Sequence, residues 1–464
     1  MSSRIALLLL ALTAAPALAG QDPLLPAPPP FQPQVDDPML TPAQPASRQV
    51  GTWEEALGLV RERSTDLRTA EANVQRAEGR WRQALATLLP NGRVSAGVAM
   101  DLLNPGLAVG ITGIPIAAQT GGSSTLRPTV PLASGSVSLT QSVVDIGAWR
   151  GLSSASAAED GAQANLQDVQ RRLTLGLSRA LVATVAAERA AEINRVGLRR
   201  ALERAALAQR SLELGAGTQL DVVRVRQDVE VARQSLISGD EQLRRAREAL
   251  GLSLGLPQEV GVNPSFQLQG LVEQTRATCT PLKALGDRPD LEAARAQVDS
   301  ARESTRQASA GYLPTLGINS NINAFTTEPG PGRVATWSIA AVLSVPIWEG
   351  GGRAGIVRER AGLEQQAAET LERTRRDVEV EVARARRSVE VAESLVKTAT
   401  EARELSAKTD QLTRRAFEVG RGSSLELVQS GAALRQAELA LALREFELVQ
   451  ARLDAFLTEA RCDW

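Results

Sequence analysis

The sequence has no histidine, a single tyrosine and two cysteines among its 464 residues, and only 3% of it is aromatic. Without histidine, a Ser-His-Asp triad, a Cys-His dyad and a histidine-ligated zinc site cannot form. Lysine occurs only at Lys283, Lys397 and Lys408, none of which ends a glycine-rich loop, so the P-loop pattern for nucleotide binding is missing too. These gaps exclude most enzyme classes, and we expect no catalytic residues, cofactor or metal site.

An excess of charge of one sign is also lacking, because 52 basic and 53 acidic residues nearly cancel. The chain therefore lacks the electrostatic signature of a nucleic-acid-binding protein. Downstream of the N-terminal segment no uncharged apolar run reaches the roughly 18 residues that a membrane-spanning helix needs. A chain of this kind could enter a membrane only as a closed β-barrel.

An export signal is present at the start of the chain. Arg4 precedes the apolar run 5–12, and Ala17-Leu18-Ala19 has the small-x-small pattern of a cleavage site. We therefore expect residues 1–19 to be a signal peptide and the proline-rich residues 20–50 to be an extended or mobile leader. Outside the cytoplasm the two cysteines, Cys279 and Cys462, can pair, but the sequence leaves a disulfide and two separate thiols as equal alternatives.

An internal repeat organises the rest of the chain. Residues 66–90 and 290–314 both begin with Asp-Leu and end with Leu-Pro, and several residues between these ends match at the same spacing. A second match aligns Gly215 and Gly217 with Gly420 and Gly422. We therefore divide the chain into a first repeat (51–257), an inter-repeat segment (258–282) and a second repeat (283–461).

Each repeat contains two segments in which apolar and polar residues alternate. The predicted strands span about 92–103 and 135–145 in the first repeat, and about 315–324 and 335–348 in the second. A soluble sandwich would bury the apolar face, whereas a membrane barrel would turn it toward lipid and line a water-filled lumen with the other face. The residues of the polar face include Asn319, Asn321, Asn323, Ser136 and Ser138.

Long helices follow the strands in both repeats. Small and apolar residues three and four apart, from Leu166 to Ala190 and from Val378 to Ala399, predict helices with a heptad seam. A helix over residues 151–194 would be roughly 65 Å long at about 1.5 Å per residue. Because neither such helices nor a four-stranded sheet can close on themselves within one chain, we expect an oligomer.

These features together resemble the TolC-type outer-membrane efflux proteins. The resemblance covers roughly residues 53–461 and depends on the duplicated helix ends, on the strand-to-helix turns 144–147 and 347–351, and on the segments that begin at Leu212 and Phe417. It implies a mainly α protein with a membrane β-barrel. Four strands from each protomer of a homotrimer would close a twelve-stranded outer-membrane barrel, which the long helices would continue as an α-helical barrel in the periplasm.

The resemblance also implies roles for individual residues. Helix breaks at the equator of the helical barrel would lie at Gly215, Gly217, Gly420 and Gly422. The helix-helix tips, where family members dock a periplasmic adaptor, would lie at Val196, Gly197 and Leu198 and at Glu401, Ala402 and Arg403. Candidates for the polar ring that closes the channel are Glu401, Glu404 and Asp410, each of which could equally lie on a solvated outer face. Asn319, Asn321 and Asn323 would line the barrel lumen.

The function implied by the resemblance is that of a passive exit duct. The chain would be the outer-membrane channel of a tripartite efflux pump for drugs or other small molecules, working with a periplasmic adaptor (membrane fusion) protein and an inner-membrane transporter of the RND, ABC or MFS class. A type I protein secretion duct is an alternative of the same kind. A soluble periplasmic coiled-coil scaffold or adaptor is an alternative of a different kind, which would explain the heptads and the leader but not the four alternating strands.

Overall fold

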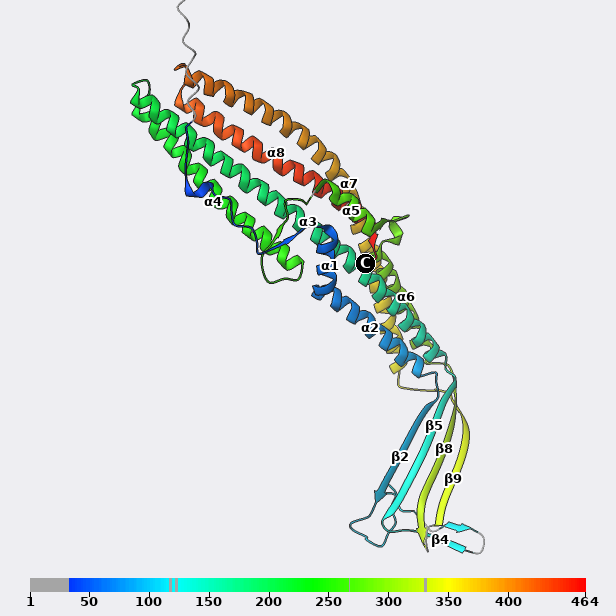
Figure 1. Cartoon of the computed structure of the whole chain (residues 1–464). Coiled ribbons are helices and arrows are strands. Elements are labelled where there is room, and N and C mark those ends of the chain that lie inside the picture. The colour runs from blue at the N-terminus through cyan, green and yellow to red at the C-terminus, as the bar shows by residue number, and fades with distance from the viewer. Residues whose placement is uncertain (1–32, 117–118, 122–123, 267, 329–331) are drawn as a thin grey trace, which may run out of the picture.

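The computed structural model describes residues 33–116, 119–121, 124–266, 268–328 and 332–464. The predicted signal peptide (1–19) and the first part of the leader (20–32) lie outside the described residues. The molecule is elongated, with a β-sheet at one end and long helices that run away from it to the other end (Figure 1). No helix among the described residues is both long enough and apolar enough to cross a membrane.

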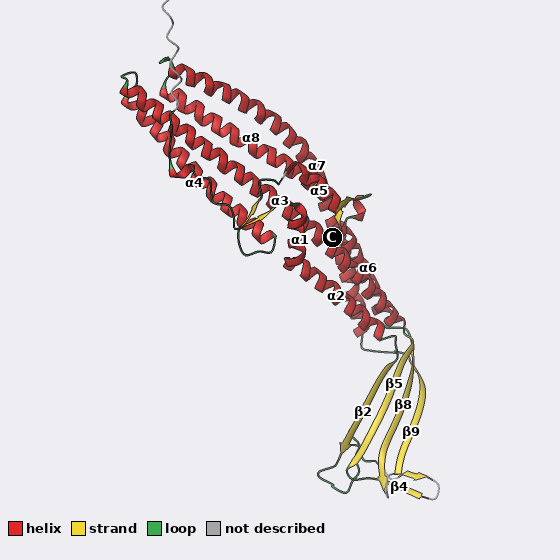
Figure 2. Cartoon of the chain, in the orientation of Figure 1, coloured by secondary structure: helices red, strands yellow, loops and turns green. Residues whose placement is uncertain are grey.

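The two halves of the chain share one series of elements, a helix, two strands, a very long helix and a second helix, which α1 precedes in the first half. The first has helices α1 (Trp53–Arg63) and α2 (Thr65–Ala86), strands β2 (Asn91–Ala99) and β5 (Leu132–Val144), and helices α3 (Ile146–Glu213) and α4 (Gln219–Ser253). The second has helix α6 (Pro289–Ala310), strands β8 (Thr315–Glu328) and β9 (Gly332–Ser344), and helices α7 (Gly352–Glu418) and α8 (Ser424–Thr458). Figure 2 shows how the strands separate from the helices along the length of the molecule.

The four main strands form one antiparallel sheet in the order β2-β5-β8-β9. A short hairpin of β3 (Gln119–Gly121) and β4 (Ser124–Pro128) lies in the loop between β2 and β5, and β4 pairs with the end of β8. Within the described residues, β2 and β9 each pair along one edge only. The sheet therefore has two open edges.

Three of the predicted strand ends are wrong: β8 continues to Glu328 and does not end at about 324, and two other strands end early. The first strand stops at Ala99 and not at about 103, because the Asp101 carboxylate accepts hydrogen bonds from the amides of Leu103 and Asn104 and so turns the chain. The last strand stops at Ser344 and not at 348, because Pro346 has no amide hydrogen to donate to a ladder. The interior of each predicted strand coincides with an observed one.

The register places the predicted polar residues on one face of the sheet. Asn319, Asn321 and Asn323 of β8 lie directly opposite Thr140, Ser138 and Ser136 of β5. Opposed residues of an antiparallel pair share a face, so these side chains form a continuous polar surface. The alternate residues, among them Ile318, Ile322, Val137 and Leu139, lie on the other face.

The long helices exceed the predicted length. Helix α3 has 68 residues and α7 has 67, each roughly 100 Å at about 1.5 Å per residue. Helix α3 begins where the Asp145 carboxylate accepts from the Ala148 amide at 2.8 Å, which caps its first turn. It packs against α2, α4, α6 and α8, whereas α7 packs against α6 and α8.

The inter-repeat segment lies midway along the helices and pairs with one strand that precedes α1 and with the C-terminal strand (Figure 1). It contains β6 (Val260–Val262), α5 (Leu268–Thr278) and β7 (Cys279–Pro281), and the short 3-10 helix η2 (Leu285–Asp287) follows it. Strand β1 (Arg48–Val50) pairs with β6, and β10 (Ala460–Cys462) pairs with β7. A disulfide between Cys279 and Cys462 joins β7 to β10, which decides between the two alternatives that the sequence left open.

The described part of the leader is docked on the helices, contrary to the expectation of an extended or mobile segment. The Asp37 carboxylate lies 2.8 Å from the Arg233 guanidinium of α4, at the start of the 3-10 helix η1 (Pro38–Leu40). Met39 and Leu40 pack on an apolar cluster of α3 and α4 residues that includes Leu198 and Leu236. Apolar burial and one ion pair thus hold residues 37–40 in place.

Candidate functional site: the helix turns and the polar sheet face

The turn between α3 and α4 lies at the end of the molecule farthest from the sheet (Figure 1). Gly215 has a φ of 75°, a conformation that glycine adopts without strain. The amides of Ala216 and Gly217 both donate to the Ser211 carbonyl, at 2.9 and 3.0 Å, and so cap the end of α3. Thr218 and Asp221 then form a capping box that starts α4.

The turn between α7 and α8 repeats this geometry at the same end of the molecule. Gly420 has a φ of 73°, and the amides of Arg421 and Gly422 donate to the Ala416 carbonyl at 2.9 and 3.0 Å. A Cβ atom on Gly422 would lie 2.8 Å from the backbone nitrogen of Phe417, so a larger residue does not fit without a shift of the backbone. A capping box of Ser423 and Glu426 starts α8. The duplicated glycines therefore build two equivalent turns.

The assignment of these glycines to the equator is wrong. Gly215, Gly217, Gly420 and Gly422 all lie in the two turns that connect the long helices, far from the inter-repeat segment. The helices simply continue for longer than the sequence estimate, because residues after 194 keep the apolar spacing that buries Leu198, Ala201 and Ala208.

Each turn exposes a pair of apolar side chains. Leu214 and Leu220 flank the first turn, and Val419 and Leu425 flank the second, with between 46% and 69% of their surfaces exposed. The pairs occupy equivalent positions in the two repeats. The end of the helical bundle thus presents a duplicated apolar surface beside its glycines.

A hydrogen bond joins the two turns. The Ser424 hydroxyl at the start of α8 donates to the Asp221 carboxylate in the first turn of α4. This hydrogen bond and a second one from the Thr218 hydroxyl lower the pKa of the Asp221 carboxyl from its ordinary value, because they stabilise the ionised form. The two helix pairs are therefore connected at their distal ends.

The residues predicted as helix tips lie inside helices. Val196, Gly197 and Leu198 are within α3, and Leu198 is fully buried. Gly197 is small for a packing reason, since a Cβ atom there would lie 2.6 Å from the Cδ atom of Arg435 on α8. The tip assignment failed because a glycine at a helix crossing has the same appearance in the sequence as a glycine at a helix end.

The predicted tip of the second repeat, and the gate candidates, lie along α7. Glu401, Ala402, Arg403 and Glu404 are exposed residues in the body of this helix. Asp410 is half-buried and accepts a hydrogen bond from the Ser430 hydroxyl of α8 at 3.3 Å. These residues therefore belong to a helical surface below the turn, and not to the turn itself.

A charged groove of about 460 Å³ lies between α3, α7 and α8 next to these residues. Glu438 of α8 lies 2.9 Å from Arg200 of α3 and 3.8 Å from Arg403 of α7. Glu404 and Arg189 also line the groove. The salt bridges of Glu438 connect the α7–α8 pair to α3 across the boundary between the two repeats.

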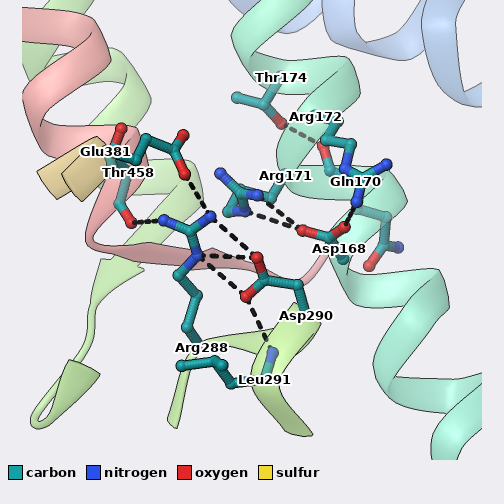
Figure 3. A network of polar contacts seen from close by, with 10 residues as sticks. All are labelled: Asp168, Gln170, Arg171, Arg172, Thr174, Arg288, Asp290, Leu291, Glu381 and Thr458. Atoms are coloured by element: carbon teal, nitrogen blue, oxygen red, sulfur yellow. Dashed lines mark hydrogen bonds and ion pairs between the residues drawn. The ribbon is translucent and has the colours of Figure 1, made fainter. Parts of the chain in front are cut away.

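A second polar network ties the middle of the molecule together, and the sequence analysis missed it (Figure 3). Arg288, which is 3% exposed, precedes α6 and donates to Asp290 at 2.9 Å, to Glu381 of α7 at 2.5 Å and to the Thr458 carbonyl of α8 at 3.3 Å. One guanidinium thus links three helices. The only available signal was the position of Arg288 two residues before the repeated Asp290-Leu291 pair.

Comparisons with known proteins agree with this architecture. The model of the outer membrane efflux protein family matches residues 56–256 and 280–454. The chain is 27% identical over 233 residues to the alkaline protease secretion protein AprF of Pseudomonas aeruginosa, and 25% identical over 279 residues to the pyoverdine export outer membrane protein OpmQ of Pseudomonas putida. These alignments cover 48% and 59% of the chain, and 47% and 57% of the two relatives, so the chain spans about half their length.

Solved structures show the same fold along most of the chain. The outer membrane protein VceC from Vibrio cholerae superimposes with a TM-score of 0.72 at 15% identity, covering 87% of this chain and 95% of that one. The open state of the MtrE outer membrane channel from Neisseria gonorrhoeae gives a TM-score of 0.69 at 16% identity, covering 92% and 97%. The chain therefore belongs to the outer membrane efflux protein family and has the TolC-like fold of its channels, with the sheet in the outer membrane and the helices in the periplasm.

Proposed function

We propose that three copies of this chain form a passive exit duct through the outer membrane and the periplasm. The observation that supports this most strongly is the sheet, which has two open edges and one apolar face. Open edges carry unpaired amides and carbonyls, which lipid does not tolerate. Pairing of β2 in one copy with β9 in the next satisfies both edges, and three copies give a closed barrel of twelve main strands.

The polar face of the sheet then lines the lumen. Asn319, Asn321 and Asn323, with Ser136 and Ser138 opposite them, provide hydrogen-bonding groups that keep water along the wall. A hydrated wall of uncharged amides and hydroxyls selects weakly among solutes. The transporter in the inner membrane would then determine which solutes enter the duct.

The two helix turns are the proposed docking site for a periplasmic adaptor, in place of the residues within α3 and α7. Leu214 and Leu220, with Val419 and Leu425 in the second repeat, offer exposed apolar side chains at the end of the bundle. The apolar side chains can bury surface against a helical hairpin of the adaptor, and the glycines leave room for its close approach. An adaptor bound there would connect the duct to an inner-membrane transporter.

The gate is proposed to include the exposed carboxylates of α7. Glu401 and Glu404 project from the helix near the charged groove, whereas Asp410 already accepts a hydrogen bond from Ser430. Three copies of each would repel one another if they converged on the axis. Changing both Glu401 and Glu404 to glutamine should raise single-channel conductance in planar bilayers, and an unchanged conductance would contradict their place at the constriction.

The cargo is proposed to be drugs or other small molecules, with protein as the second candidate. The relatives' names cover a secreted protease, fusaric acid resistance and pyoverdine export. Because the name of one relative, AprF, refers to protein secretion, a type I secretion duct is the alternative within the same architecture.

Deletion of the gene and complementation test the proposed function. Lost resistance to several unrelated compounds, restored by the wild-type chain, would support small-molecule efflux. Loss of one secreted protein with unchanged resistance would support secretion. If the chain were recovered in the osmotic-shock fluid and not in the outer membrane, the duct would be contradicted.

A further inference from the structure

The polar face of the sheet carries a single fixed charge within the main strands. In the described stretches 91–99, 132–144, 315–327 and 335–344, the only Asp, Glu, Lys or Arg is Arg93 of β2. Glu328 and Arg333 lie at the far end of the sheet, next to the loops. Apart from Arg93 and these two terminal residues, the four strands are uncharged.

The register places Arg93 on the polar face. Arg93 lies opposite Ser138 of β5, which lies opposite Asn321 of β8, which lies opposite Ser338 of β9. This row crosses the sheet on the face that also bears Asn319 and Asn323. Two positions further along the same face, the Ser95 and Ser136 hydroxyls lie 2.7 Å apart, which independently shows that β2 and β5 direct these side chains to one side.

No carboxylate on these strands can neutralise Arg93. The residue is exposed, and neither its own strand nor its neighbour β5 contains an acidic residue. In the proposed closed barrel, β2 would pair with β9 of the next copy. Residues 335–344 of β9 contain no charged residue, so this strand offers the guanidinium no carboxylate either.

We propose that the three Arg93 side chains form a ring of positive charge in the barrel lumen and give the barrel section of the duct a preference for anionic solutes, such as those that carry carboxylate or phosphate groups, opposite in sign to the carboxylates proposed at the gate. This inference depends on the proposed function, because the ring exists only if three copies close the barrel. Rings of arginine or lysine select anions in other pores, and the planar guanidinium binds carboxylate and phosphate with two parallel hydrogen bonds.

The distance over which the Arg93 ring attracts anions depends on the salt concentration. The field of an exposed charge decays over about 10 Å at 0.1 M ionic strength and about 30 Å at 0.01 M. A ring on the wall of a wide barrel therefore covers the whole cross-section only in dilute salt. The anion preference should be strongest in dilute salt and should fade as the salt concentration rises.

Planar bilayers with the full-length protein test this proposal. The reversal potential is measured across a salt gradient of about 0.01 M to about 0.1 M, where screening is weak. Compared with the wild type, Arg93→Gln should shift the potential toward cation preference, Arg93→Glu should shift it further, and Arg93→Lys should leave it unchanged. Arg245→Gln is the matched control, because it removes one charge per chain from an exposed pair with Glu241 on α4, far from the sheet.

Block of the channel by citrate, a trivalent carboxylate, is a second measurement. Citrate is added to the compartment of the bilayer chamber into which the β-barrel opens. Its block of the open channel should weaken about eightfold in Arg93→Gln, since each of three exposed charge pairs contributes a factor of about two. Identical reversal potentials and identical citrate block in the wild type, Arg93→Gln and Arg93→Glu would overturn the ring and leave the duct intact. A wild type that gives no conductance steps would contradict both the duct and the ring.

Discussion

The Ser424 hydroxyl of the second repeat donates a hydrogen bond to the Asp221 carboxylate of the first. Asp221 also completes the capping box of α4, because it accepts from the backbone amide of Thr218 at 2.9 Å. One carboxylate therefore fixes the first turn and attaches it to the second. Glu426 holds the equivalent position in the second turn but has no hydrogen bond across the turns among the described residues.

Asp221→Asn should increase local opening of both turns, whereas Glu426→Gln should increase it only in the turn between α7 and α8. Loss of a helix cap costs about 1 kcal/mol, and the lost hydrogen bond to Ser424 adds to this. Hydrogen exchange of the amides around residues 211–221 and 416–426, followed by mass spectrometry, distinguishes the two results. If Asp221→Asn left exchange at residues 416–426 unchanged, the hydrogen bond between the two turns would have no energetic role.

The contribution of Asp221 to the stability of the two turns should decrease at low pH. Its pKa is lower in the folded protein than the ordinary value of 3.8, so its stabilisation is present above that value and is lost as the pH falls through the lower, folded pKa. The difference in local opening between the wild type and Asp221→Asn should be constant from pH 7 to about 5 and should shrink below about 4. A difference that grew on acidification would contradict this assignment.

Gly420→Ala should destabilise the second turn, because an alanine with a φ of 73° costs about 1–2 kcal/mol. Gly362→Ala is the matched control, since Gly362 lies inside α7 and no described neighbour comes within 4 Å of the place that a Cβ atom would take. That change should stabilise the helix by about 0.4–1 kcal/mol. Thermal unfolding in detergent measures both, and equal shifts of the midpoint would show that the turn is not strained by a side chain.

Replacing Cys279 and Cys462 together by serine should lower the thermal midpoint. The disulfide closes a loop with a sequence separation of 183, and native disulfides typically contribute about 2–5 kcal/mol. Both cysteines are fully buried, so mild reductant should act slowly on the folded protein. Rapid reduction without prior unfolding would contradict the buried position of the bond.

Arg288→Ala should be destabilising, by about 1–3 kcal/mol, because it removes the buried partner of Asp290, of Glu381 and of the Thr458 carbonyl. Arg375→Ala is the control, since Arg375 forms an exposed pair with Glu379 on the surface of α7 at 3.4 Å, and such pairs contribute about 0–1 kcal/mol. Comparable midpoints for the two variants would show that the buried network does not hold α6, α7 and α8 together.

The strands and the repeat could be predicted from the sequence because their signals are periodic. Alternation of apolar and polar residues from Leu316 to Asn323 fixes which side chains share a face, and the register confirms that face. The order of the elements follows from the duplication. Pairing of the cysteines could not be predicted, because it depends on β7 and β10 lying side by side, and these strands are three residues long.

Positions along the helices were harder to predict. The stripe of α3 that is buried includes Asp168, Arg171 and Thr174, which a search for apolar residues passes over. Asp168 pairs with Arg171 at 2.7 Å and also with Arg172, so ion pairs replace an apolar contact at this position. In the sequence, Gly197 has the appearance of a helix end. In the structure it lies inside α3 and leaves room for the side chain of Arg435. Such positions are determined by neighbouring helices and not by local sequence.

Native mass spectrometry of the full chain, extracted from the outer membrane, tests closure of the sheet by three copies most directly. The pairing of β2 with β9 of the next copy predicts a complex of three times the mass of the mature chain, which separates into monomers only on heating in detergent. A monomer or a dimer in the membrane fraction would contradict the twelve-stranded barrel, and with it the duct.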